Sequence, residues 1–300
     1  MADGSGSASA AAAERRKMYD CRADITVAEA LKIYTGQRPL SELPTPAKPA
    51  KPTFVLLYGP PGSGKSTALS RVQALTKLNP ADAVTISLDA LVESVRTFCA
   101  ETTAIGLHAK NALERGNQAT VDENFKAAAK PYLGMMMAKG NNRPGAAKGA
   151  KVMSLNEIRK EALGVAVEAG KNIIYERTGS GIFEKELFEV LQNKYTIYVV
   201  YPRIDERELQ SRLVKRPFQQ LEETPSFFRV VAPALAGRFI GESEAYLKEI
   251  IELKKNRRIE KVFILEGDNV TRIEGGRRKT RRHKQKRRAR STRLRMPENQ

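Results

Sequence analysis

Residues 58–67 combine the residue types that hold a chain of phosphates. The stretch reads YGPPGSGKST, and it fits the spacing G-x-x-x-x-G-K-[ST]. Glycines let backbone amides approach phosphate oxygens, and a helix that begins there adds a partial positive charge. A lysine at this position reaches the β- and γ-phosphates, and the next hydroxyl ligates Mg²⁺. The stretch therefore predicts a site for the triphosphate of ATP or GTP, formed by Gly59, Pro60, Pro61, Gly62, Ser63, Gly64, Lys65, Ser66 and Thr67, with Ser66 as the metal ligand.

An aspartate follows the next apolar run. Residues 83–88 read AVTISL, and Asp89 comes directly after them. In open α/β sheets, ligands bind at the carboxyl ends of the strands. A carboxylate there can accept a proton from an attacking hydroxyl or hold Mg²⁺ through water. The same aspartate could instead cap a helix that begins near Leu91, and both roles remain open.

The third apolar run, at residues 171–176, also ends in polar side chains. Glu176 and Thr178 fall at the same predicted edge, where one can bind the hydroxyls of an acceptor and the other can support it. Polarity at a strand end and another helix cap are the alternatives. The last predicted strand ends in LEGDN, which would place Asp268 and Asn269 near a nucleobase.

Two arginines follow the fourth predicted strand. Arg212 and Arg216 are four residues apart, so they project from one face of a helix that we expect Pro217 to end. Arginines in such a lid could close over the nucleotide and stabilise charge on the transferred phosphoryl group. Arg229 and Arg238 are weaker candidates for the same lid. A solvated basic face is the alternative for each of them.

The elements that must position these residues alternate along the chain. Short apolar strands separated by helical segments predict a parallel sheet with helices on both faces. We expect the fold of the P-loop NTPases and kinases, with five parallel strands in the order 2-3-1-4-5 and an arginine-bearing lid. The strands are expected at residues 53–58, 83–88, 171–176, 195–201 and 260–267.

The flanking segments differ in composition from this α/β region. Thr26 with Glu29, and Ser154 with Glu157, have the spacing of capping boxes and predict helix starts. The helices within the polar stretch from residue 101 are ambiguous, and part of it is expected to be a mobile loop. We divide the chain into a disordered N-terminus (1–17), a short helical segment (18–40), a proline-rich linker (41–52), a kinase domain (53–270, with an insertion at 101–153) and a disordered basic tail (271–300).

Charge is concentrated at the C-terminus. The net charge is +18, and residues 277–300 contribute +11 of it through twelve Lys or Arg and one acid. The basic run at residues 277–295 could bind DNA or RNA electrostatically, or could serve as a nuclear-localisation signal. The two cysteines, Cys21 and Cys99, fit neither a disulfide framework nor a zinc site. No apolar run is long enough to span a membrane, so we expect a soluble protein of the cytoplasm or nucleus.

Taken in order, these motifs resemble zeta-toxin-domain kinases. The resemblance covers roughly residues 53–270 and includes GPPGSGKST, the aspartate after the second strand, EAGKNIIYERTGS, YTIYVVY…RLVKR and VFILEGDN. It implies that Asp89 is the base, that Glu176 and Thr178 bind the acceptor, and that Arg212 and Arg216 contact phosphates. It also implies Mg²⁺ with ATP or GTP as donor, and an acceptor similar to UDP-N-acetylglucosamine.

Three features depart from that family pattern. The basic residue that often follows the aspartate closely comes later here, at Arg96, the segment between Asp89 and Glu176 is unusually long, and the basic tail is foreign to the toxins. The tail is similar in composition to tails on proteins of large eukaryotic DNA viruses. Two other hypotheses therefore stay open: a polynucleotide 5′-hydroxyl kinase, and a basic nucleic-acid-binding protein whose kinase domain is inactive.

Overall fold

The computed structural model describes residues 25–47, 50–137, 153–179, 185–223, 231–256 and 258–273. The predictions for residues 1–17, Cys21, Arg229 and the basic run 277–295 lie outside these ranges, and the side chains of Arg96 and Cys99 are not described. Among the residues described, no helix is long and apolar enough to cross a membrane.

The centre of the fold is a sheet whose strand order matches the predicted order. Strand β1 (Thr53–Tyr58) lies between β3 (Ile173–Arg177) and β4 (Thr196–Pro202) and is parallel to both. Strands β2 (Val84–Ile86) and β5 (Lys261–Glu266) extend the parallel sheet on the two sides. Because these strands are parallel neighbours, the carboxyl ends of β1, β2 and β3 lie at one edge of the sheet.

The count of five strands was wrong. A sixth strand, β6 (Asn269–Ile273), pairs antiparallel with β5 at the edge of the sheet. Gly267 and Asp268 form the two-residue turn between them, and Gly267 has a φ of 56°, which glycine adopts readily. Strand β6 ends at Ile273, so the sheet extends three residues beyond residue 270, where the kinase domain was expected to end.

Alternate residues of the strands point to opposite faces of the sheet and pack into two separate apolar layers. Phe54, Leu56 and Tyr58 of β1 belong to a large cluster on one face of the sheet. Val55 and Leu57 point to the other face, where they pack with residues of α3 (Lys65–Thr76). Both faces are therefore covered by helices, as predicted, and β1 is buried along almost its whole length.

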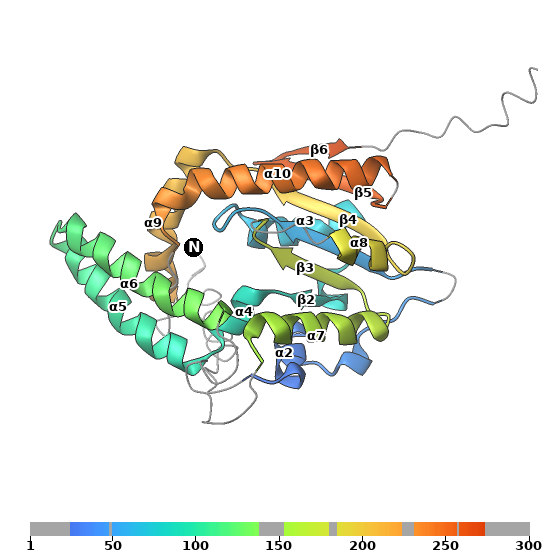
Figure 1. The fold of residues 1–300 in the computed structure, drawn as a ribbon, viewed down its shortest axis with the longest axis horizontal. Coiled ribbons are helices and arrows are strands. Elements are labelled where there is room, and N and C mark those ends of the chain that lie inside the picture. The colour runs from blue at the N-terminus through green and yellow to red at the C-terminus, as the bar shows by residue number, and fades with distance from the viewer. Residues whose placement is uncertain are drawn as a thin grey trace, which may run out of the picture.

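The large layer is covered by α2 (Val27–Tyr34), α7 (Leu155–Glu168), α8 (Lys185–Leu191) and α10 (Ala236–Lys255). Figure 1 places α2 and α7 near β2, and α10 near β5 and β6. The capping boxes predicted at Thr26 and Ser154 are both present, with each hydroxyl accepting from the amide three residues on. Two helix starts far apart in the chain were therefore readable from local sequence.

The segment before the P-loop packs on the domain. Ile25, Tyr34 and Leu43 are buried in the large apolar layer. The buried ammonium group of Lys171 donates to the carbonyl of Leu43 at 2.7 Å and to Thr45 Oγ1 at 2.8 Å. These contacts fasten part of the proline-rich stretch to the start of β3.

A helical hairpin occupies most of the polar segment that the sequence left ambiguous. It consists of α5 (Arg96–Glu114) and α6 (Gln118–Met137), and in Figure 1 it projects from the sheet beside α9 (Glu206–Glu223). Residues 138–152, where a mobile loop was expected, lie outside the described ranges. Gly116, with a φ of 68°, allows the tight reversal between the two helices.

The prediction that Pro217 ends its helix was also wrong. Helix α9 continues through Pro217 to Glu223. A proline inside a helix removes one backbone hydrogen bond, here the bond to the carbonyl of Leu213. Leu213, Pro217 and Leu221 are all buried and are spaced four residues apart, so packing along one face stabilises the helix across the missing bond.

Candidate active site

The loop after β1 has the backbone geometry that its glycines were expected to provide. Gly62 and Gly64 have φ angles of 83° and 93°, and α3 begins directly after Gly64. A Cβ atom on Gly62 would lie 3.2 Å from side-chain carbons of Leu209 and Leu213. The loop is therefore shaped by left-handed glycines and is packed closely beneath α9.

Lys65 lies on the inner side of this loop. Its Nζ donates to the carbonyl of Gly59 at 2.8 Å and to that of Pro60 at 3.0 Å. These acceptors place the ammonium group at the first turn of α3, where the partial positive charge of the helix end adds to it. The two together favour an anion at the mouth of the loop.

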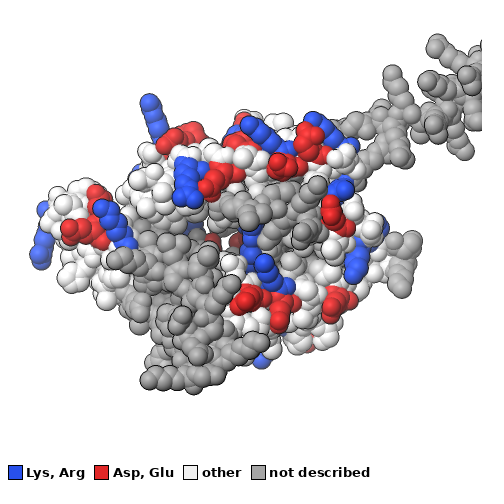
Figure 2. Space-filling model, in the orientation of Figure 1, with Lys and Arg blue, Asp and Glu red and all other residues white. Residues whose placement is uncertain are grey.

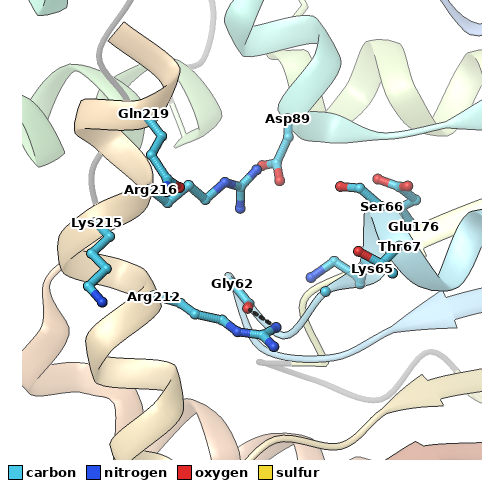
Figure 3. A pocket seen from close by; sticks show the side chains of 11 residues that line it. Gly62, Lys65, Ser66, Thr67, Asp89, Glu176, Arg212, Lys215, Arg216 and Gln219 are labelled. Atoms are coloured by element: carbon cyan, nitrogen blue, oxygen red, sulfur yellow. Dashed lines mark hydrogen bonds between the residues drawn. The ribbon is translucent and has the colours of Figure 1, made fainter. Parts of the chain in front are cut away.

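The loop opens into a cavity of about 350 Å³ that brings together residues from four parts of the chain. Figure 3 shows the side chains from α3, the first turn after β2, the end of β3 and α9 pointing toward this common space. The lining residues are Gly62, Gly64, Lys65, Ser66, Thr67, Asp89, Glu176, Arg212, Lys215, Arg216 and Gln219.

Asp89 is in the first turn of α4 (Leu88–Glu93) and its side chain lines the cavity. The helix begins three residues earlier than expected, with Ser87 in the N-cap position. Asp89 is therefore not the helix cap. Figure 3 shows its carboxylate directed toward Arg216 across the cavity.

Glu176 and Thr178 are placed differently. Glu176 pairs with Leu57 in the sheet, which brings its side chain to the cavity beside the end of β1. Thr178 is not among the lining residues, and its carbonyl accepts a hydrogen bond from Ser243 Oγ at 3.1 Å. Of the two predicted acceptor-binding residues, the structure brings one to the cavity.

Helix α9 forms the opposite wall. Arg212 donates to the carbonyl of Gly62 at 3.4 Å and pairs with Glu208, so it bridges the helix and the loop. Arg216 also lines the cavity, as the sequence predicted. Lys215 and Gln219 line it too, and sequence analysis missed them. Residues 212, 215, 216 and 219 share one helical face, because they are spaced i, i+3, i+4 and i+7. Helical spacing from the two predicted arginines could therefore have identified Lys215 and Gln219.

Three of the weaker candidates are elsewhere. Arg238 belongs to α10, pairs with Glu242 at 2.7 Å and does not line the cavity. The turn that includes Asp268, with Asn269 after it, does not line the cavity either. Arg71 of α3 donates to the carbonyls of Gly267 and Asp268 at 2.7 and 2.9 Å, which holds this turn against the P-loop helix.

Basic and acidic side chains line different parts of the cavity. Four of the lining residues are basic and two are acidic, and the basic ones come from the P-loop and α9. On the visible face in Figure 2, Lys and Arg instead alternate with Asp and Glu, most clearly along α10. The clustered cations attract a polyanion. The two carboxylates beside them can accept hydrogen bonds from a hydroxyl group.

Aromatic packing supports the base of the loop. Tyr58, the last residue of β1, stacks on Tyr201 of β4 with ring centroids 4.7 Å apart and also contacts Tyr246 of α10. Burial raises the pKa of Tyr58 far above its usual range, so this phenol stays neutral beside the loop. A buried, uncharged aromatic ring that packs on two others therefore lies directly before Gly59 in the chain.

The Gly62→Ala protein is expected to lose both stability and nucleotide affinity. A side chain at a left-handed φ costs roughly 1–2 kcal/mol of unfolding free energy. The added methyl would also press on Leu209 and Leu213, whose positions depend on the loop. Denaturant unfolding and ATP titration measure the two effects.

Gly116→Ala is the matched control for Gly62→Ala. Gly116 has a similar positive φ, but a Cβ there would meet no atom within 4 Å, and it lies in the hairpin turn. We expect the control to lose stability and to retain ATP affinity. Equal ATP affinity in both variants would contradict the role of Gly62 in shaping the loop.

Comparisons with known proteins found a matching family model and similar solved structures. The family model described as an AAA domain matches residues 54–230, more than half of the chain. A solved structure from a study of the PezAT chromosomal toxin–antitoxin system of Streptococcus pneumoniae is similar, with 16% identity and a TM-score of 0.46, over 83% of this chain and 81% of that chain. No curated protein matches the chain. The family match includes the P-loop, Asp89, Glu176 and α9.

Proposed function

The chain belongs to the AAA domain family, and we propose that it is a P-loop phosphotransferase of the zeta-toxin-like kind. It would transfer the γ-phosphoryl group of ATP or GTP to a hydroxyl acceptor. The observation that carries this proposal is the cavity itself, in which the P-loop and basic side chains of α9 meet two carboxylates at the sheet edge. Two carboxylates beside the loop give an acceptor hydroxyl a proton acceptor and a hydrogen-bond partner in the same cavity as the donor site.

The donor would be held by the loop and by α9. Amides of the loop and the ammonium of Lys65 would bind the β- and γ-phosphates. Arg212 and Arg216 would approach from the opposite wall and stabilise the charge that spreads over the transferred group. Their guanidinium groups suit this task because they bind phosphate oxygens through paired donors.

A magnesium ion fits the oxygen atoms present. The Ser66 hydroxyl lies in the same cavity as the carboxylates of Asp89 and Glu176. In the described part of the chain, no three His, Cys, Asp or Glu gather into a metal site. Mg²⁺ is commonly bound by one or two protein groups together with substrate phosphates, so Ser66 and the nucleotide would hold it. When bound, it would neutralise charge between the β- and γ-phosphates.

Asp89 would act as the general base. The acceptor oxygen bonds to the γ-phosphorus as the bond to the β–γ bridging oxygen breaks, and the hydroxyl proton passes to the Asp89 carboxylate. The diphosphate leaves with its electron pair, held by the loop. Glu176 would fix the direction of the acceptor hydroxyl, with Thr178 supporting that edge of the sheet. Fixing both reactants in this way supplies much of the rate increase in phosphoryl transfer.

An acceptor screen tests this function. The protein would be incubated with Mg²⁺ and γ-labelled ATP or GTP in the presence of UDP-sugars, nucleosides or 5′-hydroxyl oligonucleotides. By resemblance, we expect label on a sugar nucleotide similar to UDP-N-acetylglucosamine. Label on no hydroxyl acceptor, from a protein that binds ATP, would favour the inactive-domain hypothesis.

A polynucleotide 5′-hydroxyl kinase is the second candidate. The charge of +11 in residues 277–300 supports it, because each phosphate that a basic side chain neutralises releases counterions. Label on the oligonucleotide alone would select it. Nucleic-acid binding that is unaffected by loss of the P-loop lysine, without transfer, would instead select the third hypothesis, a basic binding protein.

Truncation after Gly276 is expected to remove most retention of DNA or RNA at low salt. The removed segment carries twelve Lys or Arg, and no aromatic residue follows Phe263, so its binding would be electrostatic and independent of base sequence. A tail with the same composition in scrambled order is the control and should retain binding. The melting midpoint should change little, and a large loss of stability would show that the tail packs on the domain.

A further inference from the structure

Helix α9 is held at two places. Its first half packs on the P-loop through Leu209 and Leu213, which lie against Gly62, and through the bond from Arg212 to the Gly62 carbonyl. Its second half is away from the loop and packs on the α5–α6 hairpin. The residues of α9 that line the cavity, Arg212, Lys215, Arg216 and Gln219, span the stretch from the first attachment to the second.

The second attachment is an apolar cluster with its own membership. The rings of Phe125 on α6 and Phe218 on α9 lie 5.6 Å apart. Lys110 of α5 also pairs with Glu222 of α9 at 3.2 Å. The cluster includes no residue of the sheet and consists of Ala109, Ala112, Val121, Phe125, Ala128 and Leu221, with Ile105 and Phe218 packed against it.

The hairpin is also joined to the other wall of the cavity. Helix α4, which carries Asp89, ends at Glu93, and α5 begins at Arg96 after a two-residue connection. The hairpin therefore extends from the helix of the proposed base to the helix of the proposed lid arginine. The packing of the hairpin on these two helices therefore affects the distance between Asp89 and Arg216, which face each other in Figure 3.

The interruption at Pro217 makes this second attachment necessary. Proline removes the backbone hydrogen bond to Leu213, so the two halves of α9 are less rigidly joined than in a regular helix. Arg216 and Gln219 stand on either side of the interruption. The direction of the second half then depends on what Phe218 and Leu221 contact.

We propose that the α5–α6 hairpin sets the position of Arg216 and Gln219 relative to Asp89, with Phe125 and Phe218 as positioning residues. This inference rests on the proposed phosphotransferase function, because it assigns a purpose to the distance across that site. The hairpin acts as a brace between the walls of the cavity. Loosening it would leave the P-loop intact and would misplace the groups that act on the γ-phosphate.

Phe125→Ala tests the brace in the full-length protein. We expect the transfer of label from γ-labelled ATP, to water or to the acceptor that the screen identifies, to fall by roughly 10- to 100-fold, since small misplacements near reacting groups have effects of this size. The dissociation constant of ATP should change far less, because the P-loop and Arg212, which would also hold the donor, are joined to the first half of α9 and not to the cluster. Phe125→Leu, which retains most of the apolar volume, should restore most of the rate.

Leu107→Ala is the matched control. Leu107 is on α5 of the same hairpin, but 52% of it is exposed and it is not part of the cluster. Its transfer rate should equal that of the unchanged protein. A rate for Phe125→Ala equal to that of Leu107→Ala, in folded proteins that bind ATP, would overturn the brace and leave the proposed function standing.

A charge exchange provides a second route if Phe125→Ala does not fold. Lys110→Glu and Glu222→Lys should each lower the transfer rate several-fold, and the double variant should restore it. Unchanged rates in both single variants would overturn the inference. Failure of the unchanged protein to bind ATP would instead overturn the proposed function, so the two failures are distinguishable.

Discussion

Lys65→Ala protein should remain folded and bind Mg·ATP roughly 10- to 100-fold more weakly than the unchanged protein, the range that corresponds to loss of a charge-assisted hydrogen bond. The Lys65 ammonium lies within 3.0 Å of two loop carbonyls, at the first turn of α3. No other basic side chain lines the cavity from the loop itself. The phosphates would therefore lose their contact at the point where the loop encloses them.

Lys215→Ala is the control for this loss of charge. Lys215 also lines the cavity, but it does so from α9. Isothermal titration of both variants with Mg·ATP, beside a thermal melt, separates a specific contact from general electrostatic attraction. Unchanged affinity in a folded Lys65→Ala protein would contradict the assignment of residues 59–67 as the phosphate-binding loop.

Asp89→Asn protein should lose kcat by about 10²-fold or more, which is the scale of general-base catalysis. Asparagine retains the shape of the side chain and cannot accept the proton of the acceptor hydroxyl. A carboxylate is a weak base at neutral pH, yet it would suffice for the proposed reaction because a loose transition state releases the proton late. The affinity for ATP should change little, since in the proposed site the phosphates would contact the loop and α9.

Two variants make this result specific. Asp82→Asn changes a carboxylate in the turn Pro80–Asp82, which does not line the cavity, and should leave kcat unchanged. Glu176→Gln should act mainly on the KM of the acceptor. Steady-state kinetics with the identified acceptor measures all three proteins. Near-normal kcat in Asp89→Asn would move the base elsewhere, with Glu176 as the next candidate.

Local patterns in the sequence were sufficient for much of the sheet. Strand β1 begins and ends where it was predicted, and the strand order is the one expected for the fold of the P-loop NTPases and kinases. The capping boxes and the turn glycines depend on neighbours within about four residues. Such short-range features are visible in the chain because the atoms that satisfy them are close in sequence.

Helix α9 shows where prediction from local sequence patterns fails. Proline disfavours a helix interior by about 3 kcal/mol, so a local rule ends the helix at Pro217. Apolar contacts with the P-loop at one end and with the hairpin at the other stabilise the continued helix. Those partners are remote in sequence, and their contribution cannot be assessed before the fold is known. Strand β6 likewise depends on the free edge of β5.

The sequence by itself determined the glycine-rich loop after β1, the parallel sheet and the edge of the sheet at which Asp89 and Glu176 lie. Only the tertiary structure decided the membership of the cavity, which admits Lys215 and Gln219 and leaves out Thr178 and Arg238. The physical reason is distance. A motif fixes the chemistry of residues that are neighbours in the chain, whereas a cavity is defined by side chains whose separation depends on how whole helices pack. Here that packing is the placement of α9 between the loop and the hairpin.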